Sequence, residues 1–265
     1  MPEGDFVRRV AARLDQALSG RTITHSLLRW PSLGGASLVG LDAHGVWAYG
    51  KHLLMPLSDG STLRTHLRMD GSYHVERAID GHPARRSRAH RWTSRVVLAN
   101  EAWVVIGTKL GMADLVRTRD VRRLLAHLGP DIMAEDFDPK EAGRRIAAQG
   151  NRAIGAVLLD QTVVAGVGTI YLAEGLWEWK VRPDRPACDV PDLAGLLEHI
   201  RSILWRSATA RWIGPTSDPR PGFETNAHGR LHQPCRRCST PIAVMRVEPP
   251  PFDRPAFHCP TCQPN

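Results

Sequence analysis

Two pairs of cysteines constrain the C-terminal part of this chain more than any other feature. Each pair is a CxxC motif, formed by Cys235 with Cys238 and by Cys259 with Cys262, and about 20 residues separate the two motifs. Such a pattern supplies four thiolates to a tetrahedral zinc ion, so we expect residues 228–265 to form a zinc ribbon around one structural Zn2+. Two disulfides are the alternative, which a cytoplasmic chain disfavours. Cys188 stands alone and is expected to be incidental.

The first ten residues do not have the pattern of a secretory signal peptide, so we do not expect secretion. These residues, MPEGDFVRRV, place acids where a signal peptide has basic and apolar regions. The sequence has no apolar run near the ~18 residues that cross a bilayer. With 42% hydrophobic and 23% charged residues, the composition is that of a globular protein. We expect a soluble, cytoplasmic, monomeric protein.

The charge is basic, at +8 for 265 residues. A positive field attracts a polyanion such as DNA, although an arginine-rich solvated surface would give the same balance. Only four of the 35 basic residues are lysine, at positions 51, 109, 140 and 180. A retained lysine in such a chain suggests a need for a compact ammonium group.

Hydrophobic spacing divides the chain into three segments. Residues 5–19 predict an amphipathic helix, because Phe6, Val10, Leu14 and Leu18 recur four residues apart. Residues 21–116 predict short strands, one of them at 22–28, separated by turns that include a hairpin turn at 58–60. Further helices are predicted at 119–128, 138–148, 153–161, 169–178 and 191–210. We therefore expect an α+β protein with an N-terminal helix and a β domain, either a sandwich or a barrel (1–117), a helical domain (118–227) and the zinc ribbon (228–265). The polar segment 80–91 is predicted to be a loop, either solvated or touching phosphate.

The start of the chain could supply a nucleophile. Removal of Met1 would expose a secondary amine at Pro2, and an α-amino group is partly unprotonated at neutral pH. Such an amine can attack an aldehyde-like carbon, with Glu3 beside it as acid or base. An unremarkable terminus is the alternative, because many proteins begin Met-Pro.

A glycine-rich turn precedes the predicted helix at 169–178. It reads Gly166-Val167-Gly168-Thr169-Ile170-Tyr171, followed by Glu174. Backbone N–H groups at a helix start can bind phosphate. A plain turn is equally compatible with this sequence.

Taken together and in order, these motifs resemble one family. Pro2-Glu3-Gly4, Gly50-Lys51-His52-Leu53, the GVGTIY turn and the terminal ribbon are similar to those of the formamidopyrimidine-DNA glycosylase/endonuclease VIII family. The PEGD start and the HLRMDG segment at 66–71 look most like its actinobacterial endonuclease VIII branch. The resemblance runs from residue 2 to 263. It implies an antiparallel β-sandwich in the first domain and a DNA-binding helix–two-turn–helix in the middle domain.

The resemblance also implies site residues. Pro2 would attack C1′ of the damaged nucleotide and form a Schiff base, Glu3 would act as acid/base, and Lys51 would contact phosphate beside the lesion. β,δ-Elimination would then leave a one-nucleotide gap. Arg254 would grip phosphate from the tip of the zinc hairpin, as part of the catalytic set.

Further DNA contacts are implied at Gly168, Thr169 and Tyr171, and Met69 would fill the hole left by the flipped nucleotide. Met69 could instead be a core methionine of a strand. Thr169 departs from the family pattern, which has asparagine there, so phosphate contact at this position is in doubt.

The implied activity is that of a bifunctional DNA glycosylase and AP lyase of base excision repair. Oxidised pyrimidines and abasic sites are favoured as substrates in double-stranded DNA, with single-stranded or bubble DNA as further candidates. An oxidised-purine preference and a non-catalytic damaged-DNA binder are the alternatives. Lesion choice is expected to depend on a short loop at 211–227.

Overall fold

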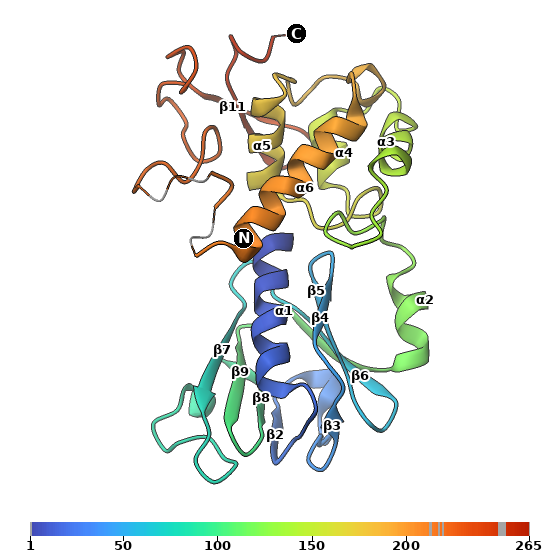
Figure 1. Cartoon of the computed structure of the whole chain (residues 1–265), viewed down its shortest axis with the longest axis vertical. Helices are drawn as coiled ribbons and strands as arrows, with labels where there is room; N and C mark the ends of the chain where they lie inside the picture. Colours follow the sequence, from blue (N-terminus) through green and yellow to red (C-terminus); the bar gives the residue numbers. More distant parts are fainter. Residues whose placement is uncertain (1, 212–213, 217, 219, 249–252, 265) are drawn as a thin grey trace. The chain divides into compact units, whose positions relative to one another are not determined.

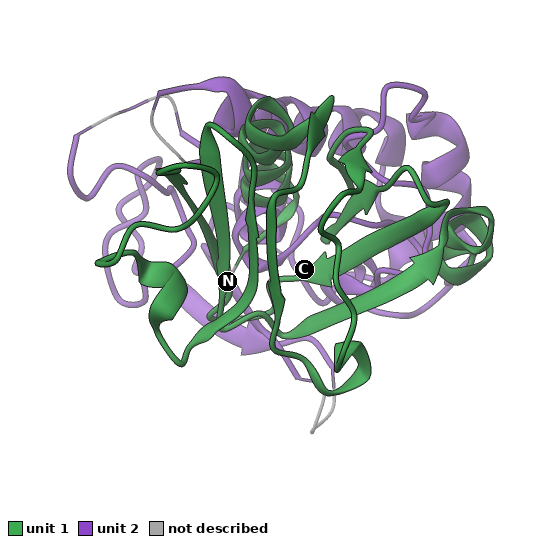
Figure 2. Ribbon diagram, turned by 90° about the horizontal axis from the view of Figure 1, so that it is seen from below, with its two compact units in different colours: residues 1–127 green, residues 128–265 purple. Residues whose placement is uncertain are grey.

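The computed structural model describes residues 2–211, 214–216, 218, 220–248 and 253–264. It divides into two compact units, residues 1–127 and 128–265 (Figure 2). The finer boundaries expected at 117/118 and 227/228 stay predictions. In the part of the chain that the structure describes, no helix has both the length and the apolar character needed to cross a membrane.

The first unit is a β-sandwich with a helix packed on it (Figure 1). One antiparallel sheet has the order β10-β6-β5-β4, the other β2-β8-β9-β7, and β1 pairs with β3. The strand bounds are β1 Arg21–Thr22, β2 His25–Leu28, β3 Asp42–Ala43, β4 Trp47–Tyr49, β5 His52–Pro56, β6 Ser61–His66, β7 Ser72–Arg77, β8 Ser94–Ala99, β9 Trp103–Thr108 and β10 Met112–Arg117. Short 3-10 turns, η1 Pro31–Leu33 and η2 Arg88–His90, interrupt the connections.

Helix α1 (Gly4–Leu18) closes the core of this unit. Its buried side chains recur at the three- and four-residue intervals of one helix face, and they join apolar residues from both sheets. The most buried positions are Val7, Ala11, Leu14 and Leu18, whereas Phe6 and Val10 of the expected stripe are only partly buried. The helix predicted at 5–19 is therefore present. Its core-facing side is centred on Val7 and Ala11, one residue after the expected Phe6 and Val10.

The predicted turn and loop of this unit are also present. The turn at 58–60 joins β5 to β6, and the Asp59 carboxylate accepts a hydrogen bond from the backbone N–H of Ser61 at 2.9 Å. Segment 80–91 is irregular apart from η2, whose Ala89 is buried against the outer face of β8 and β9. The segment therefore covers a sheet as well as meeting solvent.

The second unit is helical and ends in a hairpin. It contains α3 Pro139–Ala147, α4 Ile154–Leu159, α5 Thr169–Glu178 and α6 Leu193–Thr209, then strands β11 Ala243–Arg246 and β12 Pro255–His258. The expected helix at 119–128 lies in the first unit as η3 Thr118–Asp120 and α2 Val121–Leu125. A further turn, η4, spans Ala187–Asp189. Helix α6 packs on α3 and α5, and β12 packs on α5.

Two turns connect α4 to α5, and one side chain holds them. The Gln161 amide donates to the carbonyls of Leu159 and Val167 at 2.9 and 3.0 Å. Its carbonyl oxygen accepts from the Gly166 N–H at 3.0 Å. This gives a helix–two-turn–helix, as the sequence predicted.

Candidate functional site

The proposed nucleophile and acid/base stand at the start of α1. Glu3 occupies the N-cap position, its carbonyl accepts from the Val7 N–H at 3.0 Å, and the residue is buried. Pro2 precedes it and is partly exposed. Met1 lies outside the described residues, so its removal stays a prediction.

Helix α1 is held in register with the strand that leads to Lys51. The Asp15 carboxylate accepts from the Val46 N–H at 2.8 Å, and α1 packs on β4 and β5. From Asp15 back to Glu3 the helix rises about 18 Å, and from Val46 to Lys51 the chain rises about 17 Å. The β4–β5 turn lies at the same end of this unit as the first turn of α1 (Figure 1). Glu3 and Lys51 therefore lie at a similar distance along this unit from the Asp15–Val46 contact.

Lys51 itself sits in a two-residue hairpin turn. Tyr49 pairs with His52, which leaves Gly50 and Lys51 as the loop, and Gly50 has a φ of 55°. A glycine with positive φ at the first position is typical of a type II′ hairpin, which matches the strand twist. The turn therefore displays the lysine at the tip of a rigid ribbon.

Two imidazoles lie directly behind this lysine. His52 and His66 are paired across β5 and β6, with ring centroids 4.9 Å apart in an edge-on arrangement. Burial, followed by the charge of Lys51, lowers the pKa of His66 to about 4. Burial, followed by His66, lowers the pKa of His52 to about 4. Both rings are neutral at pH 7, so neither adds a positive charge beside Lys51.

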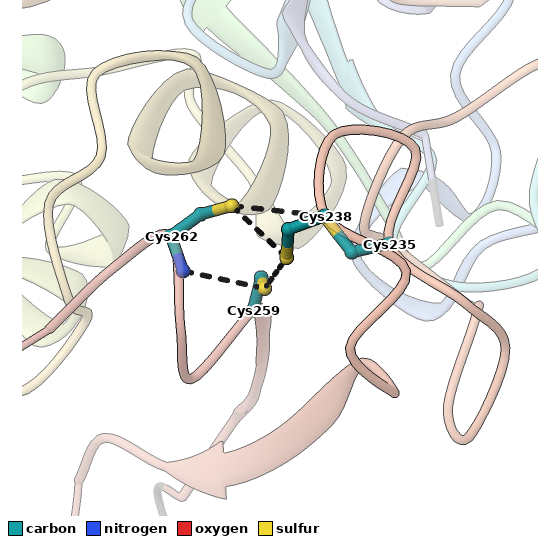
Figure 3. Close-up of side chains that lie close together, drawn as sticks. All are labelled: Cys235, Cys238, Cys259 and Cys262. Carbon is teal, nitrogen blue, oxygen red and sulfur yellow. Dashed lines mark hydrogen bonds between the residues drawn. The ribbon is translucent and has the colours of Figure 1, made fainter.

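The four predicted zinc ligands come together in the second unit (Figure 3). Their sulfur atoms all lie within 4.8 Å of one another. Individual S–S separations are 3.9 Å for Cys235–Cys262 and 3.4 Å for Cys238–Cys259. Four sulfurs at 2.3 Å from a tetrahedral zinc would be about 3.8 Å apart. The cluster can therefore hold a metal ion. Cys188 is exposed and lies outside it.

The cysteine cluster is anchored to α5 by polar contacts. The Trp177 indole N–H donates to Sγ of Cys235 at 3.4 Å. The Arg237 guanidinium stacks on the Trp177 ring, 3.7 Å from its centroid, and pairs with Glu178 at 2.6 Å. Hydrogen bonds and packing contacts of this kind, made to the ligands of a metal, fix the orientation of those ligands. These contacts attach the cysteine cluster directly to the C-terminal end of α5.

The other end of α5 carries the predicted phosphate site. Gly168 is the N-cap residue and is buried, while Thr169 begins the helix and is partly exposed. Tyr171 is only 1% exposed and belongs to the hydrophobic core. The tyrosine therefore supports α5 from inside, and of these three residues Thr169 offers the accessible side chain.

Arg254 and Met69 occupy exposed loops. Arg254 directly precedes β12, and its carbonyl accepts from the Val247 N–H at 3.3 Å across the hairpin. Met69 follows β6 and is 64% exposed, so it is not a core methionine. Both side chains are exposed, so a ligand could reach them. Their roles, like those of Pro2, Glu3 and Lys51, stay predictions.

Comparison with known proteins decides the family. Residues 1–126 match the formamidopyrimidine-DNA glycosylase N-terminal domain, and residues 128–213 match the formamidopyrimidine-DNA glycosylase H2TH domain. The chain belongs to the formamidopyrimidine-DNA glycosylase family. Family membership makes it a DNA glycosylase and AP lyase of base excision repair, with damaged DNA as its partner.

Full-length relatives and solved structures agree. The chain is 36% identical to a probable endonuclease 8 2 of Streptomyces coelicolor, over 99% of this chain and 94% of that protein. It is 33% identical to the DNA-(apurinic or apyrimidinic site) lyase Nei2 of Mycolicibacterium smegmatis, over 99% of each. A Lactococcus lactis formamidopyrimidine-DNA glycosylase bound to DNA with an AP site superposes with a TM-score of 0.83 at 25% identity, covering 100% of both chains.

Sequence reasoning missed the polar anchors of the site. The Glu174 carboxylate accepts three backbone N–H groups, from Asn226, Ala227 and His228, at 2.8–2.9 Å. Gln263 is fully buried, donates to the Val181 carbonyl at 2.7 Å and accepts from the Cys259 N–H at 2.8 Å. In the sequence, Glu174 follows the glycine-rich turn and Gln263 follows the last cysteine, but neither position reveals a distant backbone partner.

Proposed function

We propose that this chain excises oxidised pyrimidines and cleaves abasic sites in double-stranded DNA, with Pro2 as its nucleophile. The observation that carries the proposal is the fixed register between α1 and the β4–β5 hairpin, which brings Glu3 and Lys51 to one level. The pyrimidine preference is supported by the endonuclease 8 relatives, since a Herpetosiphon aurantiacus formamidopyrimidine-DNA glycosylase is less similar, at 32% identity.

The proposed reaction uses the free Pro2 nitrogen after Met1 has been removed. The nitrogen lone pair attacks C1′, and the bond to the damaged base breaks, so the base leaves with a proton. Glu3 donates a proton to the sugar ring oxygen as the ring opens to an iminium. Loss of a proton from C2′ expels the 3′ phosphate, and a second elimination expels the 5′ phosphate. Lys51 would hold the phosphate beside the lesion through charge.

The second unit would grip the DNA backbone. Arg254 at the hairpin and Thr169 at the start of α5 would each contact a phosphate, the latter with support from the backbone N–H groups of the helix start. Zn2+ on the four cysteines would fix the hairpin that carries Arg254. The ion would act structurally, because all four positions of a tetrahedral site are filled by thiolates.

The remaining expectations belong to the same proposal. The protein would act as a monomer on DNA in the bacterial nucleoid, and would accept single-stranded or bubble DNA as well as duplex. The loop at 211–227, which would discriminate lesions, falls partly outside the described residues.

Borohydride trapping tests the proposal. Protein shown by intact mass to lack Met1 is incubated with duplexes carrying an abasic site, an oxidised pyrimidine or 8-oxoguanine, and reduced with borohydride. We expect a covalent adduct and faster cleavage at the pyrimidine lesion. A short N-terminal extension converts the Pro2 nitrogen to an amide and should abolish the adduct while leaving DNA binding intact.

Two results would overturn parts of this proposal. Faster cleavage at 8-oxoguanine would assign the purine preference instead. Absence of an adduct from metal-loaded, DNA-binding protein with a free Pro2 would leave only a damaged-DNA binder.

A further inference from the structure

An ion-paired arginine ties the β11–β12 hairpin of the second unit to helix α4. The Arg152 guanidinium donates from Nη2 to the Glu248 carboxylate at 2.9 Å, and from Nη1 to the Asp160 carboxylate at 3.0 Å. Nη1 also donates to the Gln149 side-chain carbonyl at 2.8 Å. Arg152 directly precedes the N-cap of α4, and Asp160 is the C-cap residue of the same helix. Glu248 lies 96 positions after Arg152, beyond the end of β11, so the contact joins distant parts of one compact unit.

The hairpin end of this contact is next to the backbone of Arg254. Val247, the residue before Glu248, donates its backbone N–H to the Arg254 carbonyl at 3.3 Å. Beside that hydrogen bond, Arg246 forms an ion pair with Asp253 across the hairpin at 3.0 Å. A displacement of Glu248 therefore moves the strand to which the Arg254 backbone is bonded.

Val247 also packs directly on α4. A Cβ at Gly155 would lie 2.9 Å from Cγ1 of Val247, so the valine occupies the space that a larger residue would need. The Gly155 N–H donates to the Pro183 carbonyl at 2.9 Å, which holds this turn of α4 in place. The base of the hairpin is thus attached to α4 by an apolar contact and by the ion pair of Arg152.

The second carboxylate of the network shapes the connection from α4 to α5. Oδ1 of Asp160 accepts from the Thr162 N–H at 3.0 Å and from the Thr162 hydroxyl at 2.6 Å, while Oδ2 accepts from Arg152. From Thr162 the chain runs through the glycine-rich turn to Thr169 at the start of α5. Arg152 therefore contacts both the hairpin that carries Arg254 and the connection that leads to Thr169.

The exposure of these side chains favours a geometric role for the network. Arg152 is 38% exposed, Asp160 25% and Glu248 30%. Ion pairs open to solvent to this degree add little to the free energy of unfolding, because water screens their charges. A planar guanidinium with donors in fixed directions still sets the distance and angle between two carboxylates.

We propose that Arg152 is a positioning residue for DNA binding. It holds the β11–β12 hairpin and the connection before Thr169 at a fixed spacing, so that Arg254 and Thr169 engage phosphates of the same DNA. The inference rests on the proposed function, which assigns these two phosphate contacts, and it adds a residue that acts on them through Glu248 and Asp160. Contact points already held at the correct spacing lose less conformational entropy on binding.

Glu248→Ala is the decisive variant, because charge and position predict opposite results for it. Removal of an acid from a DNA-binding unit strengthens binding when only charge matters. If Glu248 holds the hairpin, its loss should weaken binding about threefold or more, and Arg152→Ala should do the same. Dissociation constants are measured at several salt concentrations, with the zinc-loaded full chain and a duplex carrying an uncleavable abasic analogue. Arg144→Ala, which breaks an exposed ion pair on α3, is the matched control and should change the affinity less than about twofold.

A double variant separates positioning from an independent effect. If Glu248 acts through Arg254, the variant with both Glu248→Ala and Arg254→Ala should bind within about twofold of Arg254→Ala alone. Losses that multiply would overturn the proposal. So would wild-type or tighter binding by Glu248→Ala while Arg254→Ala binds more weakly.

Hydrogen exchange in DNA-free protein measures the hairpin by itself. In Arg152→Ala and Glu248→Ala the Val247 amide should exchange about threefold faster or more, since its hairpin loses one attachment. The Cys259 amide, which donates to the Gln263 side chain, and the zinc content should be unchanged. Wild-type exchange at Val247 would overturn the proposal. Wild-type affinity in Arg254→Ala, together with faster exchange in Glu248→Ala, would remove the phosphate contact from the proposed function and keep Arg152 as the residue that holds the hairpin.

Discussion

The Asp15 carboxylate accepts a hydrogen bond from the backbone N–H of Val46, at 2.8 Å. This contact joins residues 31 positions apart and fixes the far end of α1 against the start of β4. A shift of the helix by one residue would move Glu3 by about 1.5 Å relative to Lys51. Catalytic groups lose efficiency over displacements of this size.

We therefore expect Asp15→Ala to slow borohydride trapping on abasic DNA about tenfold or more, with a folded protein about 1–2 kcal/mol less stable because the Val46 N–H loses its acceptor. Asp15→Asn keeps a carbonyl oxygen and should restore trapping. The checks are single-turnover trapping rates and thermal melts. Wild-type rates in the alanine variant would show that the register is held elsewhere.

Lys51→Ala should reduce base excision by roughly a hundredfold, since the hairpin tip would lose its only charge. Lys51→Arg keeps the charge but not the compact ammonium, and we expect partial activity. Cleavage of a lesion duplex, with melts to verify folding, measures both. Lys140→Ala, on α3 in the other unit, is the control. Full excision by the alanine variant would remove Lys51 from the mechanism.

Arg254→Ala should weaken DNA binding and flatten its salt dependence by about one phosphate contact, a change of roughly 0.9 in the slope of log K against log salt. Affinity is measured at several salt concentrations on an uncleavable abasic analogue. Arg144→Ala, which breaks an exposed ion pair with Glu141 on α3, should leave the slope unchanged. An identical slope in the Arg254 variant would exclude the contact.

Metal content should follow the four clustered cysteines only. We expect one zinc per chain by elemental analysis, its loss in Cys262→Ala, and full retention in Cys188→Ala, because Cys188 is remote from the cluster. Chelation should abolish DNA binding, since the hairpin lacks a core of its own. Zinc-free protein with normal affinity for DNA would contradict this.

Stability should fall on acidification. His52 and His66 each have a folded pKa of about 4 against 6.5, so below pH 6.5 the unfolded chain binds more protons than the folded one. Above pH 6.5 the two rings do not lower the free energy of unfolding. As the pH falls from 6.5 towards 4, each ring lowers it by at most about 3 kcal/mol. His52→Gln should therefore show a smaller drop in Tm between pH 7.5 and pH 5 than the wild type. An equal drop would place the acid sensitivity elsewhere.

Sequence patterns predicted the features that depend on local chemistry. The spacing of the two cysteine pairs predicted that the four thiols lie together, because metal ligation needs only four thiolates at a suitable spacing. Periodic apolar residues predicted α1, although its buried face is centred one residue later, on Val7 and Ala11. Residues 22–28 were expected as one strand. They form β1 and β2, with Thr24 between them donating to the Gly81 carbonyl at 2.6 Å.

Contacts over long sequence separation could not be predicted. Asp15 and Glu174 both accept backbone N–H groups from distant segments, and a backbone donor has no residue identity to detect. The DNA contact implied at Tyr171 stays a prediction. Its burial could not be predicted from the motif, because it follows from the packing of α5, which is buried along almost its whole length. Met69 could be assigned to a loop only when the end of β6 was known.

The pairing of Gln263 with Val181 has a consequence for synthesis. The two residues are 82 positions apart, which at 5–20 residues per second is about 4 to 16 s of translation. Helix α5 is therefore synthesised well before the ribbon that packs on it, and Trp177 precedes its partner Cys235 by 58 positions, which is about 3 to 12 s of translation. The nascent chain passes through a stage in which the β-sandwich has been synthesised in full and the second unit has not.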